Sequence, residues 1–354
     1  MTELYYNSTP HFTRWVIDNG ALTEPFVVVD AGCQGGMHPR WEFLGRHLEF
    51  HGFDPIRAVC DSLRGESKPG RYYHNYALGS EDGERPFAVL PNAFESSFYA
   101  TDRPGAEVQT TITMTLDAVY RNGILSRADH IKLDCEGAEP EILAGAQVYL
   151  IASNPVSVQA ETNFHTSPIY PRTHFQAVND QLYGHRLRLF DLNMIRALRP
   201  AFAEAPARFF NWQDPDPMRD TPRLDIGAPT TCDALYCRDW VADEADQAGR
   251  YFYGQEPTVD KLLKAMISFE LYGLPDCAYE IAGHFHEELA RRIDVDKAMK
   301  LLLIPPPHAR NTGDVVNCLA MLGALREQVR QERPVNAARR AWRAYRTRVR
   351  KAWA

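Results

Sequence analysis

The 354-residue sequence lacks the marks of several protein classes. No apolar run approaches the roughly 18 residues that a membrane span needs. The first residues show neither the basic flank nor the apolar stretch of a secretory signal. Seven cysteines, odd in number and irregularly spaced, do not form a disulfide framework. These absences predict a water-soluble, cytoplasmic protein with reduced thiols.

Positive charge is also scarce along most of the chain. The 39 Lys and Arg residues against 46 Asp and Glu give a formal net charge of −7, so we expect no specific nucleic-acid partner. Hydrophobic residues make up 45% of the chain, enough for a buried core, and the length suggests two domains.

The exception is the segment 333–354, which holds eight basic residues and no acidic one. Its apolar residues recur at spacings of three and four, the pattern of one helix face. They are Val335, Ala338, Trp342, Tyr345 and Val349. We predict a basic amphipathic helix that docks on the acidic body or on a second copy of the chain. Contact with an anionic membrane surface is an alternative, and contact with nucleic acid or an acidic glycan is a third.

Between residues 26 and 240, apolar runs that end in an acid alternate with helical segments. The terminal acids are Asp30, Asp54, Asp134 and Glu161. This alternation predicts a Rossmann-like, doubly wound α/β fold with a mostly parallel sheet. Residues 79–115 interrupt it with Gly, Pro and Ser clusters, where we expect hairpin-like excursions.

Further elements follow from local patterns. We expect a helix over 40–47, one strand over 71–77 and, after residue 257, a series of helices that includes one over 278–293. We therefore divide the chain into a lead segment (1–25), an α/β domain (26–240), a helical extension (255–332) and the basic helix (333–354). The proline-rich stretch 200–229 is either an active-site loop or a surface connection.

A glycine-rich turn follows the first predicted strand, in the run Asp30-Ala-Gly-Cys-Gln-Gly-Gly36. Asp54 ends the next strand, 22 residues after Gly32, the spacing at which an acid meets ribose hydroxyls in nucleotide-binding α/β folds. The dinucleotide fingerprint would need a second glycine where Cys33 and Gln34 stand. S-adenosylmethionine has no pyrophosphate, so the turn favours this cofactor over NAD(P).

A third motif, Ile131-Lys-Leu-Asp-Cys-Glu-Gly-Ala-Glu139, completes a recognisable series. With the turn at 30–36, Phe53-Asp-Pro55, Asn75-Tyr-Ala-Leu-Gly-Ser80 and Thr115-Leu-Asp117, it resembles the FkbM-type methyltransferase family over residues 26–240. The resemblance implies a class I S-adenosylmethionine-dependent fold, whose seven-stranded sheet has its last strand antiparallel. It also implies O-methylation of a hydroxyl, often on a sugar or a natural-product scaffold.

The resemblance also implies roles for single residues. Asp30, Gly32 and Gly36 match the first cofactor motif, and Asp54 matches the ribose-binding acid. Ala77 and Leu78 match the place of the adenine edge, and Asp134 and Glu136 the signature beside the methyl donor.

The predicted catalytic residues are Asp134, Glu136, Glu161 and His165. Asp134 and Glu161 end neighbouring strands and should face one crevice. His165 is the natural general base, with His174 as a second candidate. Alternatively, Asp134, Glu161 and His165 could hold a divalent ion such as magnesium or manganese. Lys132 could reach a carboxylate or stay solvated.

We therefore predict an S-adenosylmethionine-dependent O-methyltransferase that acts on a hydroxyl of a sugar, glycan or related metabolite. One alternative is an NAD(P)-binding oxidoreductase, which shares the acid at the second strand. The other is a non-catalytic, methyltransferase-like interaction module.

Overall fold

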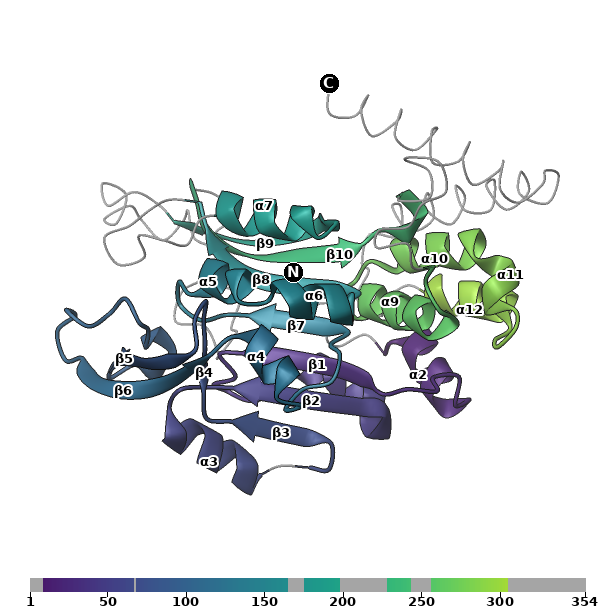
Figure 1. Ribbon diagram of the computed structural model, residues 1–354. Coiled ribbons are helices and arrows are strands. Elements are labelled where there is room, and N and C mark those ends of the chain that lie inside the picture. The colour runs from purple at the N-terminus through teal and green to yellow at the C-terminus, as the bar shows by residue number, and fades with distance from the viewer. Residues whose placement is uncertain (1–8, 67, 165–174, 198–227, 243–255, 305–354) are drawn as a thin grey trace, which may run out of the picture. The chain divides into compact units, whose positions relative to one another are not determined.

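The computed structural model describes residues 9–66, 68–164, 175–197, 228–242 and 256–304. These residues belong to two compact units (Figure 1). The α/β unit comprises residues 26–37 and 49–238, and the helical unit comprises residues 1–25, 38–48 and 239–354. His165, His174, nearly all of the proline-rich stretch and the basic segment 333–354 lie outside the described residues.

The α/β unit is built on a seven-stranded sheet in the order β3-β2-β1-β7-β8-β10-β9. Its strands are β1 (Phe26–Ala31), β2 (Leu48–Phe53), β3 (Arg71–His74), β7 (His130–Leu133), β8 (Ser157–Asn163), β9 (Leu187–Ala197) and β10 (Ala228–Arg238). The last strand, β10, runs antiparallel to both of its neighbours, whereas the pairs β2–β3, β1–β7 and β7–β8 are parallel. The predicted fold class is confirmed.

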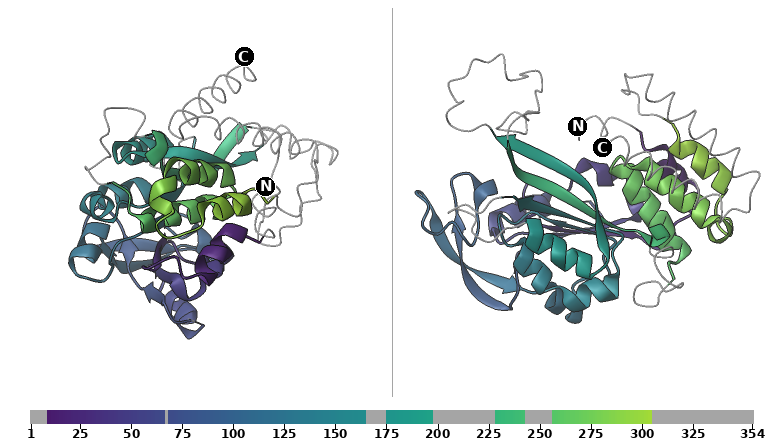
Figure 2. Two further views of the ribbon diagram at one scale, coloured as in Figure 1. Left: turned by 90° about the vertical axis from the view of Figure 1, so that its right-hand side faces the viewer. Right: turned by 90° about the horizontal axis from the view of Figure 1, so that it is seen from above.

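The centre of the sheet is apolar on both faces. Every residue of β1 is buried, as expected for a parallel strand covered on two sides. One core cluster joins the strands to the helices α4 (Leu116–Arg121), α5 (Glu139–Ala144), α6 (Gln147–Ser153) and α7 (Phe175–Gly184). Helix α3 (Arg57–Gly65) packs against β3. The strands share a progressive twist, which is clearest in the right-hand view of Figure 2.

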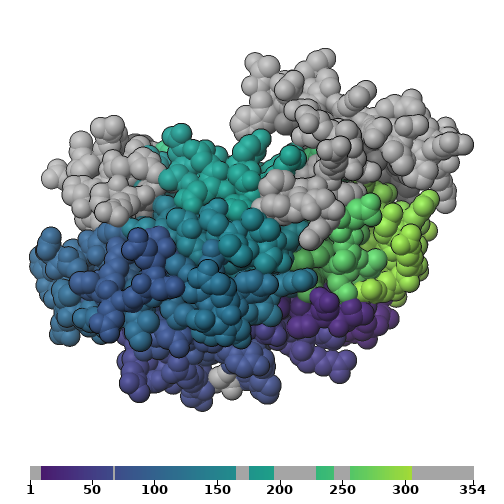
Figure 3. Space-filling model, viewed as in Figure 1, coloured from purple at the N-terminus to yellow at the C-terminus, as the bar shows by residue number. Residues whose placement is uncertain are grey.

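A small second sheet interrupts the main one, where the sequence predicts an excursion. It has the order β4-β6-β5 and consists of β4 (Ala77–Leu78), β5 (Gly83–Val89) and β6 (Glu107–Met114). Strands β5 and β6 pair antiparallel, and the short helix η2 (Ala93–Glu95) lies in their connection. Its outer surface is the steel-blue area at the left of Figure 3.

One predicted element of the α/β unit needs correction. The single strand expected over 71–77 is two strands, because β3 pairs with β2 while β4 pairs with β6. Between them, the Asn75 side chain donates to the backbone oxygens of Asp54 and Pro55, at 3.1 and 3.0 Å. These hydrogen bonds hold the backbone at the point where it leaves the seven-stranded sheet and enters the small sheet.

The helical unit combines segments from both ends of the chain. It contains α2 (His11–Asp18), the 3-10 helix η1 (Pro39–His47), α9 (Val259–Leu271), α10 (Pro275–His284), α11 (His286–Leu289) and α12 (Val295–Leu302). Helix α2 packs against η1, α9 and α12. Residues 9–25 thus share a core with the C-terminal helices, an association that the sequence analysis does not anticipate.

Two helices of this unit also differ from expectation. The segment over 40–47 is a 3-10 helix because Gly45 takes a left-handed conformation (φ 52°) that interrupts regular helix. The helix expected over 278–293 stops at Phe285, whose backbone leaves the helical region (φ −102°, ψ 37°), and α11 is a separate short helix.

Buried carboxylates join the two ends of the chain. Glu270 of α9 accepts hydrogen bonds from the backbone N–H groups of Phe12 and Thr13, at 2.9 and 2.7 Å, and from the Thr13 hydroxyl at 2.6 Å. It therefore serves as the missing N-cap of α2, since Pro10 offers no capping side chain. Asp260 accepts from the backbone and hydroxyl of Thr23 and pairs with Arg292 at 3.0 Å.

No helix within the described ranges is both long enough and apolar enough to cross a bilayer.

Candidate functional site

A cleft opens in the α/β unit, where strands β1, β2 and β7 end. It is lined by Ala31, Gly32, Gln34, Phe53, Asp54, Pro55, Ile56, Tyr76, Ala77, Leu78, Phe87, Ala93, Phe94, Ser96, Phe98, Asp134, Cys135 and Glu136. The lining therefore combines strand ends with residues of the small sheet and its connection.

The floor of the cleft begins at the glycine-rich turn after β1. The N–H groups of Gly32 and Cys33 both donate to the backbone oxygen of Phe53, at 3.0 and 3.2 Å, so the turn is held against the end of β2. Gly32 has φ +80°, and a Cβ at this position would lie 1.9 Å from the backbone oxygen of Asp134. Only glycine fits, because the backbones of two strand ends meet here.

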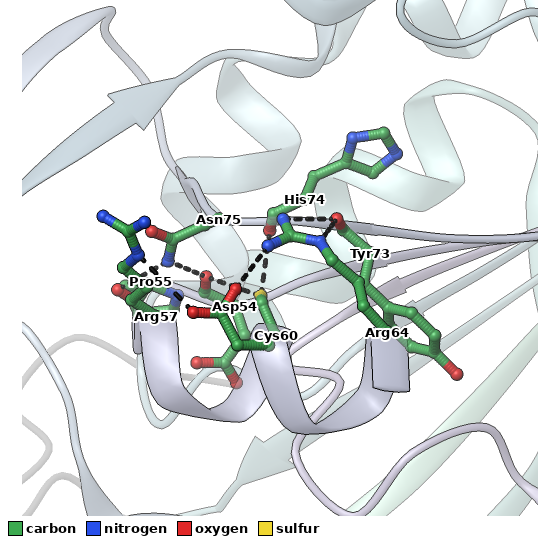
Figure 4. Close-up of polar contacts among 9 residues, drawn as sticks. Asp54, Pro55, Arg57, Cys60, Arg64, Tyr73, His74 and Asn75 are labelled. Atoms are coloured by element: carbon green, nitrogen blue, oxygen red, sulfur yellow. Dashed lines mark hydrogen bonds and ion pairs between the residues drawn. The ribbon is translucent and has the colours of Figure 1, made fainter. Parts of the chain in front are cut away.

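Asp54 is fixed at the end of β2 by backbone and side-chain contacts (Figure 4). The N–H of Ile56 donates to Asp54 Oδ1 at 2.8 Å, and Asn75 holds the Asp54 backbone oxygen. Burial raises the pKa of Asp54 from 3.8 to about 6. The cleft thus contains a rigid carboxylate that ionises near neutral pH and can accept hydrogen bonds from a pair of hydroxyls.

A lysine joins the acids of β1 and β7. The parallel register places Lys132 beside Asp30, and Asp134 is two residues further along the same strand face. Lys132 Nζ lies 3.1 Å from a carboxylate oxygen of each acid. Burial alone would lower the pKa of Lys132, but the two carboxylates raise it well above its usual value. Burial raises the pKa of Asp30 to about 6 in spite of this lysine.

Three carboxylates gather where β7 and β8 end. Oxygens of Asp134, Glu136 and Glu161 all lie within 4.8 Å of one another. Burial opposes ionisation of Asp134, but Lys132 and a hydrogen bond with Glu161 together lower the pKa of Asp134 below its usual value. Burial and the Asp134 charge raise the pKa of Glu161 well above its usual value. The environment therefore favours the ionised form of Asp134 and the protonated form of Glu161.

The same three oxygens make up a donor set that a hard divalent cation prefers. Asp134, Glu136 and Glu161 are therefore the described residues that could hold a metal ion. The sequence analysis named Asp134 and Glu161 for this role but paired them with His165, which lies outside the described residues.

The turn after β7 has an unusual backbone. Glu136 has a left-handed conformation (φ 53°) although it is not glycine, and Gly137 follows with φ +106°. The buried Glu139 accepts hydrogen bonds from the N–H groups of Cys135 (2.7 Å) and Gly137 (3.1 Å). Burial raises the pKa of Glu139 to about 7. This carboxylate holds the turn that presents Glu136, a function that the sequence analysis did not assign to it.

An aromatic wall from the small sheet and its connection was also missed. Phe87 and Phe98 meet edge to face at 5.3 Å, and the Arg85 guanidinium lies 4.0 Å above the Phe98 ring. Arg85 in turn pairs with Glu141 of α5 at 2.7 Å. Phe94 on η2 also lines the cleft and remains 57% exposed. Nothing in the local sequence ties these aromatic residues to the strand-end acids.

The structure brings most of the predicted site residues together. Those that line the cleft are Gly32, Asp54, Ala77, Leu78, Asp134 and Glu136. Asp30 is buried behind the lining and meets it through Lys132, and Glu161 lies beside Asp134 and Glu136. Gly36 closes the turn by donating to the Cys33 oxygen at 2.9 Å and is not part of the lining. The roles of these residues remain predictions.

The arrangement is matched by a known family. Residues 39–189 fit the family model described as the methyltransferase FkbM domain. The chain carries an FkbM methyltransferase domain. This domain makes the chain a methyltransferase, and S-adenosylmethionine is the cofactor that the family implies.

Two further comparisons are less informative. A solved TehB-like SAM-dependent methyltransferase from Corynebacterium glutamicum ATCC 13032 Kitasato aligns with 10% identity over 64% of this chain and 88% of that chain, with a TM-score of 0.28. At that score the assignment depends on the family model. The search of curated proteins gives no match.

The residues of the cleft fit S-adenosylmethionine. Gly32 lets two strand ends approach closely at the floor of the cleft, and Asp54 offers the carboxylate that ribose hydroxyls require. Asp54, Asp134 and Glu136 make the lining acidic, which suits the positive sulfonium.

Proposed function

We propose that the FkbM domain is an O-methyltransferase that acts on a hydroxyl of a sugar, glycan or related metabolite. The observation that carries the proposal is the single cleft lined by both Asp54 and Asp134. A carboxylate suited to ribose and a carboxylate whose pKa the neighbouring Lys132 lowers therefore line the same cleft.

Asp134, directly after β7, and Glu161, on β8, are suited to a hydroxyl acceptor. When bound, S-adenosylmethionine supplies an electrophilic methyl group, so the protein mainly has to orient the acceptor and take its proton. An ionised Asp134 oxygen can accept the hydrogen bond of the acceptor hydroxyl and orient its oxygen. Lys132 keeps Asp134 ionised, and Glu161 shares a proton with it.

A divalent cation is a second way to activate the hydroxyl. The cluster of Asp134, Glu136 and Glu161 supports it, since oxygen ligands suit magnesium or manganese. Dialysis against EDTA followed by return of Mg²⁺ or Mn²⁺ tests it. Loss and recovery of methyl transfer supports the metal, and unchanged transfer after EDTA excludes it.

Calorimetric titration of the purified protein with S-adenosylmethionine, NADH and NADPH separates the proposal from its rivals. We expect binding of S-adenosylmethionine alone, weakened about tenfold or more in Asp54→Ala, since two hydroxyl hydrogen bonds to a charged group are lost. The matched control is Asp61→Ala, an exposed acid on α3. Binding of a nicotinamide cofactor instead would favour the oxidoreductase, and no binding of any of the three would favour the non-catalytic module.

Mass spectrometry after incubation with labelled S-adenosylmethionine and a cell extract then identifies the product. A label on a carbohydrate oxygen supports the proposal, and a label on nitrogen or carbon contradicts it.

We further propose that the protein works in the cytoplasm and that segment 333–354 contacts a second copy of the chain or an anionic membrane surface. Removal of residues 333–354 tests the two proposed contacts of this segment. A fall in solution mass indicates the oligomer, and lost pelleting with anionic liposomes indicates the membrane. If neither changes, the segment has neither role.

A further inference from the structure

The cleft contains a group of residues that the proposed cofactor contacts do not use. They come from β5, η2 and the residues that follow: Phe87, Ala93, Phe94, Ser96 and Phe98. Phe94 also lies against the glycine-rich turn, since its ring atoms are 3.6 and 3.9 Å from where a Cβ of Gly35 would be. An aromatic ring therefore stands beside the turn that the cofactor motif predicts.

Phe94 is notable for its exposure. Several large apolar side chains in the described part of the chain are well exposed, and of these Phe94 alone lines the cleft. Because Phe94 lines a cleft and is not isolated on an open surface, its exposed ring offers contact area to a bound molecule. Phe98 and Phe87, by contrast, are packed against each other and need no ligand.

The turn that carries Phe94 is held on both sides. Asn92 donates to Glu95 at 2.9 Å, and Glu95 pairs with Arg103 at 2.7 Å. After the turn, Ser96 Oγ accepts from the Leu90 N–H at 3.0 Å. The ring is therefore placed before a ligand arrives, which reduces the entropy lost on binding.

The charged side chains that line the cleft indicate which class of ligand it can bind. The described lining contains the acids Asp54, Asp134 and Glu136, the amide of Gln34, and no lysine or arginine. Carboxylates and an amide suit the hydroxyls of a neutral molecule, whereas an anion would be repelled. The exposed ring of Phe94 offers a flat apolar face for the C–H groups of the same molecule.

We propose that Phe94 is the stacking platform of the acceptor subsite and that the acceptor presents a neutral pyranose ring to it. The C–H face of the ring rests on Phe94, and its hydroxyls meet Gln34, Glu136 and Asp134. This inference rests on the proposed function and adds Phe94 to it as a residue of the acceptor subsite. It also predicts that anionic sugars, such as uronic acids and sugar phosphates, bind poorly.

Saturation-transfer NMR on the full chain, with S-adenosylhomocysteine present, tests the subsite without relying on turnover. The probes are methyl α-D-mannopyranoside, methyl α-L-rhamnopyranoside and methyl β-D-glucopyranoside, with methyl β-D-glucuronide as the anionic comparison. The variants are Phe94→Ala, Phe94→Tyr, which keeps an aromatic face, and Val108→Ala. Val108 is a matched control because it is 55% exposed on β6 and does not line the cleft.

We expect transfer to the ring protons of at least one neutral glycoside, and transfer to the glucuronide that is about fivefold weaker or less. Phe94→Ala should reduce the neutral signal by about fivefold or more, while Phe94→Tyr and Val108→Ala preserve it. Affinity for S-adenosylmethionine, measured by calorimetry, should stay within about twofold in every variant.

Three results overturn the subsite: no transfer to any neutral glycoside, equal transfer in Phe94→Ala, or a Phe94→Ala protein that loses cofactor affinity. Failure of the proposed function is a different result. In that case the wild-type protein fails to bind S-adenosylmethionine, or the label of the extract experiment is found on nitrogen or carbon.

Discussion

Buried and half-buried acids occur in both units of the protein, and their surroundings differ. In the helical unit, Glu270 and Asp260 are surrounded by donors: backbone N–H groups, threonine hydroxyls and Arg292. At the strand ends of the α/β unit, Asp134 and Glu161 face each other and Glu136, and Lys132 lies 3.1 Å from Asp134.

The pKa values of the acids follow this difference. The hydrogen bonds from Thr23 and the charge of Arg292 lower the pKa of Asp260 in spite of its burial. Burial and neighbouring carboxylates raise the pKa of Glu161. A carboxylate surrounded by donors stabilises the fold, whereas a group of carboxylates that repel one another costs stability and is typical of a functional site. The comparison therefore distinguishes the acids that stabilise the helical unit from those that we predict to be functional.

The largest expected effect is a loss of stability in Gly32→Ala of the α/β unit, compared with Gly20→Ala of the helical unit. Gly32→Ala should cost about 3 kcal/mol or more of stability, because its Cβ would collide with the Asp134 backbone oxygen. Gly20 also has a positive φ (+62°) but has nothing within 4 Å of its Cβ position, so Gly20→Ala should cost only about 1 kcal/mol. Urea unfolding of both variants measures the difference, and equal costs would contradict the close approach at Gly32.

Asp134→Asn should reduce methyl transfer by about 100-fold or more, because the amide cannot take the proton of the acceptor. Affinity for S-adenosylmethionine should change much less. Transfer of labelled methyl to the extract and calorimetry provide the two measurements, with Asp61→Asn as the exposed control. A loss of cofactor affinity as large as the loss of transfer would show that Asp134 only binds the cofactor.

Glu270→Ala should cost about 2 kcal/mol, because the first-turn N–H groups of α2 lose their acceptor. Glu270→Gln keeps one acceptor oxygen and should cost about half as much. Thermal unfolding tests this, with the exposed Glu287→Ala as control. A destabilisation by Glu287→Ala equal to that of Glu270→Ala would show that the capping contacts contribute nothing.

The smallest effect is a pH dependence of cofactor affinity. Because burial raises the pKa of Asp54 to about 6, this group is protonated at pH 5 and ionised at pH 7. The ionised form accepts the stronger hydrogen bonds, so the Kd for S-adenosylmethionine should fall by about three- to tenfold across this range. Calorimetry at several pH values measures it. The dependence should disappear in Asp54→Asn; if it persists there, another group such as Asp30 is responsible.

Much of the sheet and half of the site follow from local sequence. Buried runs that end in acids mark the strands, and parallel strand ends converge, so Asp54 and Asp134 could be placed in one cleft. The mostly parallel, seven-stranded fold and the methyltransferase assignment are confirmed.

The rest depends on contacts between distant residues. Whether Lys132 reaches a carboxylate depends on the β1–β7 register, which local pattern does not fix. The cap that Glu270 provides joins residues 258 positions apart. The exposure of Phe94 beside the glycine-rich turn depends on how the small sheet folds back, and nothing in residues 91–98 encodes that return locally.

The backbone of Glu136 has a consequence for engineering. A left-handed conformation costs a non-glycine residue about 1 kcal/mol or more, and glycine or asparagine would avoid most of it. A selection for heat resistance alone should therefore recover Glu136→Gly or Glu136→Asn. Such survivors would tolerate higher temperature while losing one of the three clustered carboxylates, so we predict that heat resistance is gained at the expense of methyl transfer at this one position.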